Sequence, residues 1–478
     1  MYQNYGLFID GRWRGASDGG AAAVLSPVTE KPLGEAPVAT SADTEAAIEA
    51  ASRGLAAWRA KTAFERADAM HAIADEMIRR KDEAMRMISS ETGKPLAQSE
   101  REWGLSIDQF RWYAEEARRI YGRIVETRVP GGRFEVTREP IGIAAAFTAW
   151  NFPAALVARK VAPALAAGCS IIVRPSSQTP GVAMVMVDCC RAGDLPEGTV
   201  NLVVGPTSAT YGPIMDSAAV RKVSLTGSTR VGQQMIRDAA ATLKKVTMEL
   251  GGNAPLIVYD DADLETALNV SVPTKFANAG QVCVTADRFF IHENLHDAFI
   301  EGFAERARAL KLGDGLDPSV QMGPVINGSR RSELEGVIAD AVKAGARVVA
   351  GGGRASAFNA GFFLEPTVLA DVTDEMKVFA EENFGPIAAI TRFRDEDEVI
   401  ERANATEMGL TAYAFTRSPE RARRTVAGLK VGMVGINSFA LAASEAPFGG
   451  TKFSGMGREG GSEGIGDYLD TKLAQVVF

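Results

Sequence analysis

From residue 141 onward, short apolar runs alternate with stretches of helical character, and this alternation limits the possible folds more than any other feature of the chain. The apolar runs are IGIAAAFT at 141–148, SIIVRP at 170–175, VNLVVG at 200–205, RKVSLTG at 221–227 and KKVTMEL at 244–250. Apolar strands separated by helices of about 10 to 15 residues are typical of βαβ units, whose helices cover both faces of a parallel sheet. We therefore predict an α/β fold that contains a Rossmann-like, nucleotide-binding sheet.

A second α/β segment follows the sequence ELGGN at 249–253. It begins with PLIVYD at 255–260, and its strands and helices extend to about residue 435. We expect a cofactor-binding domain before residue 249 and a catalytic domain over 249–435, with the chemistry in the cleft between them. Nearer the N-terminus, apolar residues at helical spacing predict two long amphipathic helices, over 41–60 and 64–90.

Composition limits the class of protein. The 478 residues are 46% hydrophobic and 23% charged, which is ordinary for a globular protein. A formal net charge of −8 argues against a nucleic-acid partner, because binding to phosphates requires a basic surface. The chain has no run of about 18 apolar residues that would span a membrane, and its N-terminus lacks the basic and apolar regions of a secretion signal. We expect a cytoplasmic protein.

The chain has four cysteines and three histidines. The cysteines have neither the density of a disulfide scaffold nor C-x-x-C spacing, and Cys189 and Cys190 are predicted to be buried apolar fillers in a helix. None of the histidines stands at metal-ligand spacing with a cysteine or another histidine, so we predict no metal site. A histidine-based hydrolase is poorly supported for the same reason.

Three residues carry candidate chemistry. Cys283 lies in FANAGQVCVTADR at 276–288, Glu249 in ELGGN and Asn151 in TAWNFP. A thiolate is a strong nucleophile when a base lies close, a carboxylate can activate water, and an amide can stabilise an oxyanion. No histidine lies near Cys283 in the sequence, so Glu249, backbone amides or the positive charge of a bound cofactor has to activate it. The alternatives are an inert buried thiol at Cys283 and a core amide at Asn151.

A glycine pattern of the form G-x-G-x-x-G occurs at Gly455, Gly457 and Gly460, but only 18 residues follow it. That is too short for the rest of a βαβ unit, so we predict a loop there. Gly227 and Ser228 are better cofactor candidates, because they follow a predicted strand and lead into a helix whose N-terminus can face a pyrophosphate. The segment IIVRPSSQTP at 171–180 is the other candidate.

Together, TAWNFP, ELGGNAP, FANAGQVC and ENFGP resemble the aldehyde dehydrogenase superfamily, and the resemblance extends over essentially the whole chain. It implies oxidation of an aldehyde to a carboxylic acid with NAD or NADP, through a thiohemiacetal and a thioester on Cys283. It also implies that Asn151 and the backbone amide of Cys283 form the oxyanion hole, and that Glu249 activates the water that cleaves the thioester.

The resemblance also implies an organisation into domains and subunits. Segments 122–138 and 459–478 are expected to bridge to a partner subunit in a homodimer or homotetramer. Residues 1–121 and 139–248 then form the cofactor-binding domain, and residues 249–435 form the catalytic domain.

The resemblance assigns further residues to the cofactor. Glu382 in ENFGP is expected to hold the nicotinamide ribose, Phe384 to pack beside the ring, and Trp150 to lie at the cofactor. Lys160, which we also count as catalytic, and Arg174 are expected near the adenosine end or the cleft. The alternative for both cations is a solvated surface charge.

Two positions depart from the K-P-S-E segment of many relatives. Arg174 replaces the lysine, and Ser177 replaces the acidic residue. In those relatives the acidic side chain accepts hydrogen bonds from the adenosine ribose and repels the 2′-phosphate of NADP. Ser177 removes this repulsion and Arg174 keeps a positive charge, so we expect the site to admit NADP. Asp287 stands where asparagine is usual, and the sequence alone predicts no particular consequence of this difference.

Within the superfamily, the chain is most similar to the succinate-semialdehyde and 2-oxoglutarate-semialdehyde dehydrogenases, in segments such as WNFPAALVARKVAPALAAGC. Arg159 matches a substrate-carboxylate arginine of the former group, which implies a semialdehyde substrate. Ala277 and Ala443 depart from two other carboxylate-binding positions of that group. The alternatives are a broad-specificity aliphatic or aromatic aldehyde dehydrogenase, in which Arg159 is only structural, and a catalytically idle binding relative.

Overall fold

The computed structural model describes all residues from 1 to 478, and its largest sheet has the strand order β19-β11-β10-β7-β8-β9-β1-β2. These strands are β1 (Leu7–Ile9), β2 (Arg12–Arg14), β7 (Ile143–Phe147), β8 (Ser170–Arg174), β9 (Val200–Leu202), β10 (Val220–Thr226), β11 (Lys245–Glu249) and β19 (Gly455–Met456). The central strands β7 to β11 are parallel, as the apolar runs predict. The edge strands pair antiparallel and are too short to show a periodic pattern in the sequence.

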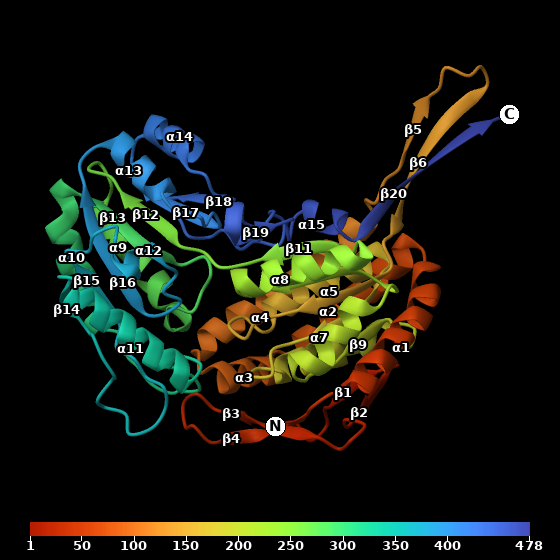
Figure 1. Cartoon of the computed structure of the whole chain (residues 1–478), viewed down its shortest axis with the longest axis horizontal. Helices are drawn as coiled ribbons and strands as arrows, with labels where there is room; N and C mark the ends of the chain where they lie inside the picture. The colour runs from red at the N-terminus through yellow and green to blue at the C-terminus, as the bar shows by residue number, and fades with distance from the viewer.

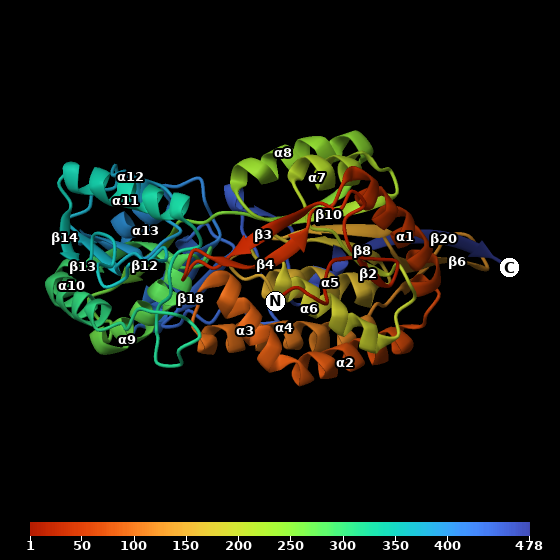
Figure 2. The same cartoon turned by 90° about the horizontal axis from the view of Figure 1, so that it is seen from below.

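Helices cover both faces of this sheet, with α7 and α8 on one side and α2, α4 and α5 on the other (Figure 2). The helical elements are α1 (Ser41–Arg59), α2 (Ala63–Arg79), α3 (Lys81–Thr92), α4 (Leu96–Ala117), α5 (Ala155–Ala167), α6 (Gly181–Cys189), η1 (Cys190–Gly193), α7 (Thr207–Asp216), α8 (Thr229–Ala239) and η2 (Ala240–Thr242). The single helix predicted over 64–90 is wrong: α2 and α3 are separate, because Arg80 leaves the helical conformation, with φ −98° and ψ 17°.

A second sheet follows Glu249 and has the order β14-β15-β16-β13-β12-β17-β18. Its strands are β12 (Ala254–Val258), β13 (Ala286–His292), β14 (Arg347–Ala350), β15 (Thr367–Ala370), β16 (Ile387–Phe393), β17 (Thr411–Phe415) and β18 (Met433–Ile436). Its helical elements are α9 (Leu264–Phe276), η3 (Ala277–Gly280), α10 (Glu293–Arg308), α11 (Gly328–Lys343), α12 (Lys377–Ala380), α13 (Glu396–Asn404) and α14 (Pro419–Gly428). Only the β14–β15 pair is antiparallel.

Separate clusters of buried hydrophobic side chains pack around the two large sheets. The chain changes from one sheet to the other between β11 and β12, at the ELGGN sequence. The domain boundaries given above stay predictions. The two α/β parts lie side by side in the molecule (Figure 1). The cavity described below is lined by residues of both parts.

A third sheet projects from the body as an arm (Figure 1) and consists of β5 (Arg123–Glu126), β6 (Gly132–Pro140) and β20 (Leu469–Val477). Strand β20 pairs with β6 along its whole length. Residues 459–466, which we predicted to belong to the bridging tail, lie against the body instead, where Glu459 forms a buried ion pair with Lys160.

The remaining elements are β3 (Ala21–Leu25), β4 (Pro32–Pro37), η4 (Lys452–Ser454) and α15 (Glu463–Gly466). The G-x-G-x-x-G glycines lie between η4 and α15. Gly455 begins the edge strand β19, and Gly457 and Gly460 have φ values of 82° and 73° in the turns after it. This confirms the prediction of a loop. No helix in the structure combines the length and the apolar character needed to cross a membrane.

Candidate active site

The carboxyl ends of β10 and β11 lead into a cavity of about 310 Å³. Its lining residues are Ala149, Trp150, Asn151, Thr226, Gly227, Ser228, Glu249, Leu250, Gly251, Cys283, Arg330, Glu382 and Phe384. Most of the residues singled out in the sequence are therefore neighbours, although they come from five separate loops. Ligands of α/β proteins bind at this carboxyl edge of parallel strands, because the loops that follow the strands converge there.

Cys283 lies in the loop between η3 and β13 and is half-buried. The loop approaches ELGGN so closely that a Cβ on Gly252 would lie 2.6 Å from the carbonyl oxygen of Cys283. Burial, together with the charges of Glu382 and Glu249, raises the pKa of the Cys283 thiol to about 12. The free thiol is therefore protonated near neutral pH, and it needs a base or a bound cation to become a nucleophile.

Glu249 is the last residue of β11 and pairs with Thr226 of β10 on one side and Gly455 of β19 on the other. Both carboxyl oxygens are buried, and neither has a hydrogen-bond partner. A Cβ on Gly449 would lie 2.7 Å from Oε1 and 2.9 Å from the carbonyl oxygen of Gly457, so the segment around Gly449 packs closely against the carboxyl group. Burial first, and the charge of Glu459 second, raise the pKa of Glu249 well above its ordinary value. A carboxylate of this kind is a competent general base.

Asn151 contacts the nucleophile loop directly. Its Nδ2 donates to the carbonyl oxygen of Gln281 at 3.1 Å, which uses one of the two amide hydrogens. Its main-chain carbonyl oxygen accepts from Lys94 Nζ at 2.6 Å and from Asn278 Nδ2 at 3.0 Å. The second amide hydrogen of Asn151 has no protein acceptor in the structure and is available to a ligand oxygen.

Glu382 and Phe384 also line the cavity, and they follow helix α12. Glu382 Oε1 accepts from the backbone amide of Gly252 at 2.8 Å, and burial, with the charge of Asp287, raises the pKa of Glu382 to about 7. The rings of Phe384 and Trp150 meet edge to face with centroids 5.6 Å apart. The lining of the cavity therefore includes the carboxyl group of Glu382 and the aromatic rings of Phe384 and Trp150.

Asp287, whose consequence the sequence did not predict, supports the segment that carries Glu382 and Phe384. Its Oδ1 accepts from Lys275 Nζ at 2.7 Å, and its Oδ2 accepts from the backbone amide of Asn383 at 3.0 Å. Both charged partners are buried. Asp287 therefore anchors Asn383, the residue that follows Glu382. The sequence could not reveal this contact, because Lys275 and Asn383 are distant from one another along the chain.

Lys160 does not line the cavity. Its side chain is fully buried on α5 and donates to Thr226 Oγ1 at 2.8 Å and to Glu459. The alternative of a solvated surface charge is thus wrong for Lys160. Glu459, which we had placed in the bridging tail, is instead a neighbour of the site that acts on the pKa of Glu249.

Arg159 is buried on the same helix, and its guanidinium carbon lies 3.9 Å from the centroid of the Phe448 ring. The structure contains no hydrogen bond or ion pair from this guanidinium to another protein group. Its charge lowers the pKa of both Cys283 and Glu249, so it lies near both. A buried arginine without a protein partner can bind an anion.

A neighbouring cavity of about 230 Å³ shares Ala149, Thr226, Gly227 and Ser228 with the first and extends to Arg174. Arg174 donates from Nη2 to the carbonyl oxygen of Gly205 at 2.9 Å. Ser177 is exposed and is not among the lining residues. Ser228 is the N-cap of α8, and no side chain caps the first amides of that helix. The two cavities together fit an elongated anionic cofactor, because uncapped amides at a helix start bind phosphate.

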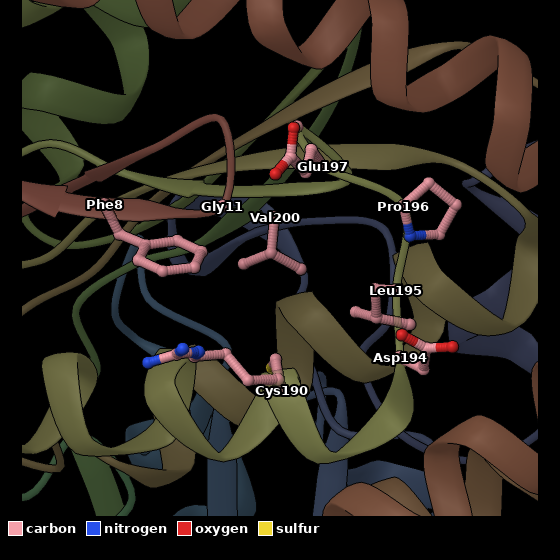
Figure 3. Close-up of a pocket in the computed structure, with 10 residues that line it drawn as sticks. Phe8, Gly11, Cys190, Asp194, Leu195, Pro196, Glu197 and Val200 are labelled. Carbon is pink, nitrogen blue, oxygen red and sulfur yellow. The ribbon is translucent and has the colours of Figure 1, made fainter.

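A third cavity, of about 160 Å³, lies between β1, η1 and β9 and has Phe8, Cys190, Leu195 and Val200 in its walls (Figure 3). It contains none of the predicted catalytic or cofactor residues. The prediction that Cys189 and Cys190 are buried fillers is confirmed, since they are 0% and 2% exposed. Burial raises the pKa of both thiols, and neither of them lines the cavity that contains Cys283.

Comparison with known proteins identifies relatives over nearly the full length. The model of the "Aldehyde dehydrogenase family" matches residues 13–474. The chain is 45% identical to 3-sulfolactaldehyde dehydrogenase of Pseudomonas putida, over 97% of this chain and 95% of that protein. It is 43% identical to succinate-semialdehyde dehydrogenase (NADP+) of Escherichia coli strain K12, over 97% and 96%. The crystal structure of a betaine aldehyde dehydrogenase variant of Staphylococcus aureus with NAD+ superposes with a TM-score of 0.97 at 32% identity, over 100% and 98%.

Proposed function

The chain belongs to the aldehyde dehydrogenase family, and we propose that it oxidises an aldehyde with a remote anionic group, using Cys283 as the nucleophile. As a member of this family it is an oxidoreductase that acts on aldehydes with NAD or NADP. The observation that carries the proposal is the single cavity that contains Cys283, Glu249 and Asn151. These three groups supply the nucleophile, the base and the oxyanion donor that the reaction needs.

In the proposed mechanism, Sγ of Cys283 attacks the aldehyde carbon while the thiol proton passes to a base. The oxygen of the resulting thiohemiacetal accepts hydrogen bonds from the Asn151 side-chain amide and the Cys283 backbone amide. A bound nicotinamide cofactor supplies the acceptor for the hydride that this carbon loses. Glu249 then removes a proton from water, the water oxygen attacks the thioester carbon, and the carbon–sulfur bond breaks to release the acid and the thiolate of Cys283.

We assign the cofactor to the two adjoining cavities. Gly227 and Ser228 lie at the start of α8, where backbone amides can bind a pyrophosphate. Glu382 and Phe384 lie in the cavity that contains the reacting groups, together with Trp150. A carboxylate can accept hydrogen bonds from a ribose, and the two rings can pack beside a nicotinamide.

Arg159 supports a substrate with an anionic tail. It is buried, its guanidinium stacks on the Phe448 ring without a hydrogen bond or ion pair to the protein, and its charge lowers the pKa of both Cys283 and Glu249. Leaving such a charge unpaired costs free energy, which a ligand carboxylate would recover. The names of the relatives describe aldehydes with a sulfonate and a carboxylate. We therefore propose a carboxylate-bearing semialdehyde such as succinic semialdehyde; a broad-specificity aldehyde dehydrogenase remains the second candidate, since Ala277 and Ala443 leave room for uncharged tails.

We expect Arg159→Ala to reduce kcat/KM for succinic semialdehyde about 10- to 150-fold more than for butanal, which has the same carbon count and no carboxylate. The reason is that a charge-assisted hydrogen bond to a carboxylate contributes about 1.5 to 3 kcal/mol. Because Arg159 also lowers the pKa of Cys283 and Glu249, both aldehydes lose some rate. The ratio of the two efficiencies, in wild type and variant, isolates the contact with the carboxylate. Equal efficiencies for the two aldehydes in wild type would favour the broad-specificity enzyme.

The choice between NAD and NADP is proposed to depend on the segment after β8. We expect Ser177→Glu to shift the ratio of kcat/KM values toward NAD, because an anion placed there repels the 2′-phosphate of NADP. Two charges about 4 Å apart interact by about 1 kcal/mol in water and about 4 kcal/mol at an effective dielectric constant near 20. Ser177 is exposed, so the lower figure is the better guide. Ser177→Gln is the neutral control, and an equal shift in both variants would contradict the charge argument.

We also propose that the arm of β5, β6 and β20 contacts a partner subunit in a homodimer or homotetramer. Ile124, Leu473 and Phe478 are 70%, 63% and 91% exposed on this arm. Large apolar side chains exposed on a projecting sheet are typical of association surfaces. A cytoplasmic location stays a prediction from the sequence, in agreement with four cysteines that are all free thiols.

A further inference from the structure

A buried lysine and a buried glutamate lie directly behind the Asn151 loop, and the mechanism above does not use them. Lys94, between α3 and α4, and Glu102, on α4, are both fully buried and form an ion pair at 2.6 Å. Lys94 Nζ also donates to the main-chain oxygen of Asn151 at 2.6 Å and lies 4.0 Å from the centroid of the Phe152 ring. The ammonium group therefore contacts two consecutive residues of the WNFP sequence.

Glu102 holds the other end of the same loop. Its Oε2 accepts from Lys94, and its Oε1 accepts from the backbone amides of Ala154 at 2.8 Å and Ala155 at 3.3 Å. These amides are at the start of α5, where no side chain of the helix itself caps the first turn. One carboxylate thus supplies the cap of α5 from a different helix. The loop from Asn151 to the first turn of α5 is held between the two charges.

The position of Lys94 is itself determined by the second half of the molecule. The backbone amide of Leu96 donates to the carbonyl oxygen of Gly315 at 2.9 Å. A Cβ on Gly315 would lie 2.1 Å from the carbonyl oxygen of Lys94, and a Cβ on Gly323 would lie 1.9 Å from that of Gly93. Main chain packed this closely has little freedom to move. Lys94 is therefore a rigid contact between the loops of the second sheet and the Asn151 loop.

We propose that Lys94 and Glu102 are positioning residues that orient Asn151 for oxyanion stabilisation, an inference that rests on the proposed role of Asn151. An oxyanion donor is effective only if it points to where negative charge develops, and a misplacement of about 1 Å reduces a rate about 100-fold. Burying two charges is costly, and well-packed apolar residues often give equal stability. A role in holding the Asn151 loop explains why Lys94 and Glu102 form a buried ion pair where apolar side chains could pack.

Lys94→Met is the first test, because methionine keeps the apolar stem and removes the ammonium group. We expect the rate constant for the burst of reduced cofactor to fall about 10- to 100-fold. The KM for the nicotinamide cofactor and the rate at which iodoacetamide alkylates Cys283 should not change, because the cofactor contacts and the thiol remain. An unchanged burst rate in a folded variant would overturn the proposal.

A double-mutant cycle with Asn151→Ala separates positioning from a general loss of structure. If Lys94 acts through Asn151, Lys94→Met has no further effect on the burst rate when Asn151→Ala is already present. Equal fold reductions in both backgrounds would overturn the positioning role and leave the proposed role of Asn151 intact. If Asn151→Ala alone leaves the burst rate unchanged, the proposed oxyanion role fails, and the positioning role fails with it.

Two further variants guard against misfolding. Lys94→Met/Glu102→Gln removes the unpaired buried charge while an amide oxygen still accepts from Ala154, so its Tm should exceed that of Lys94→Met without recovery of the burst rate. Lys244→Met is the matched control, since Lys244 is also buried and donates to the carbonyl oxygens of Ser217 and Val220. We expect it to lower Tm and leave the burst rate unchanged. Recovery of the burst rate in the double variant would contradict the positioning role.

Discussion

Cys283→Ala is expected to abolish aldehyde oxidation, with a loss of at least about 1000-fold in kcat, because no other group in the cavity can form the thioester. The fold should be preserved, since Cys283 is only half-buried and its replacement removes a single sulfur atom. Formation of reduced cofactor with a saturating aldehyde measures the loss, and thermal unfolding measures the stability of the fold.

Cys190→Ala is the matched control for this prediction. Cys190 is buried in the first half of the chain and lies in the wall of a separate cavity (Figure 3). We expect its replacement to leave kcat unchanged. If Cys283→Ala retained turnover within about tenfold of wild type, the thioester mechanism would be wrong. A loss in both variants would point to a defect of the fold and not of the nucleophile.

Glu249→Gln is expected to produce one equivalent of reduced cofactor in a burst and then to stall. If Glu249 activates the water that cleaves the thioester, its amide cannot accept the proton, and the steady-state rate should fall about 100- to 10,000-fold. Rapid mixing, followed by a steady-state measurement, distinguishes the two phases. A loss of the burst itself would instead assign Glu249 to deprotonation of Cys283. An unaltered steady-state rate would place the base elsewhere.

The raised pKa of Glu249 gives this prediction a dependence on pH. The carboxyl group is a base only after it loses its proton, so the steady-state rate of wild type should rise with pH through the elevated pKa. The same group is protonated more readily in the folded state than in the unfolded state. Its contribution to stability is therefore fully present at low pH and is lost as pH rises toward the elevated pKa. In Glu249→Gln, the steady-state rate should no longer rise with pH. The decrease in Tm as pH rises should be smaller than in wild type.

The site shows which predictions a sequence allows. Cys283, Glu249 and Asn151 stand in short sequences with distinctive glycine, proline and aromatic neighbours, and the structure brings them together in one cavity. The sequence did not predict that Lys160 and Lys94 are buried. A lysine is usually exposed, and neither sequence neighbourhood indicates that the charge is buried. The partner of Lys160 is Glu459, 299 residues further along the chain.

The alternation of apolar runs and helices determined the α/β class, because each strand buried on both faces must be continuously apolar within its own few residues. The apolar pattern did not determine the helix break at Arg80 or the antiparallel edge strands of the first sheet. Both depend on packing against distant segments of the chain. Only the tertiary structure decided which charges are buried and paired. Lys160 pairs with Glu459, and Arg159 packs on the Phe448 ring, because the fold brings these distant segments of the chain together. Contacts between residues far apart in the chain leave no periodic pattern in either segment.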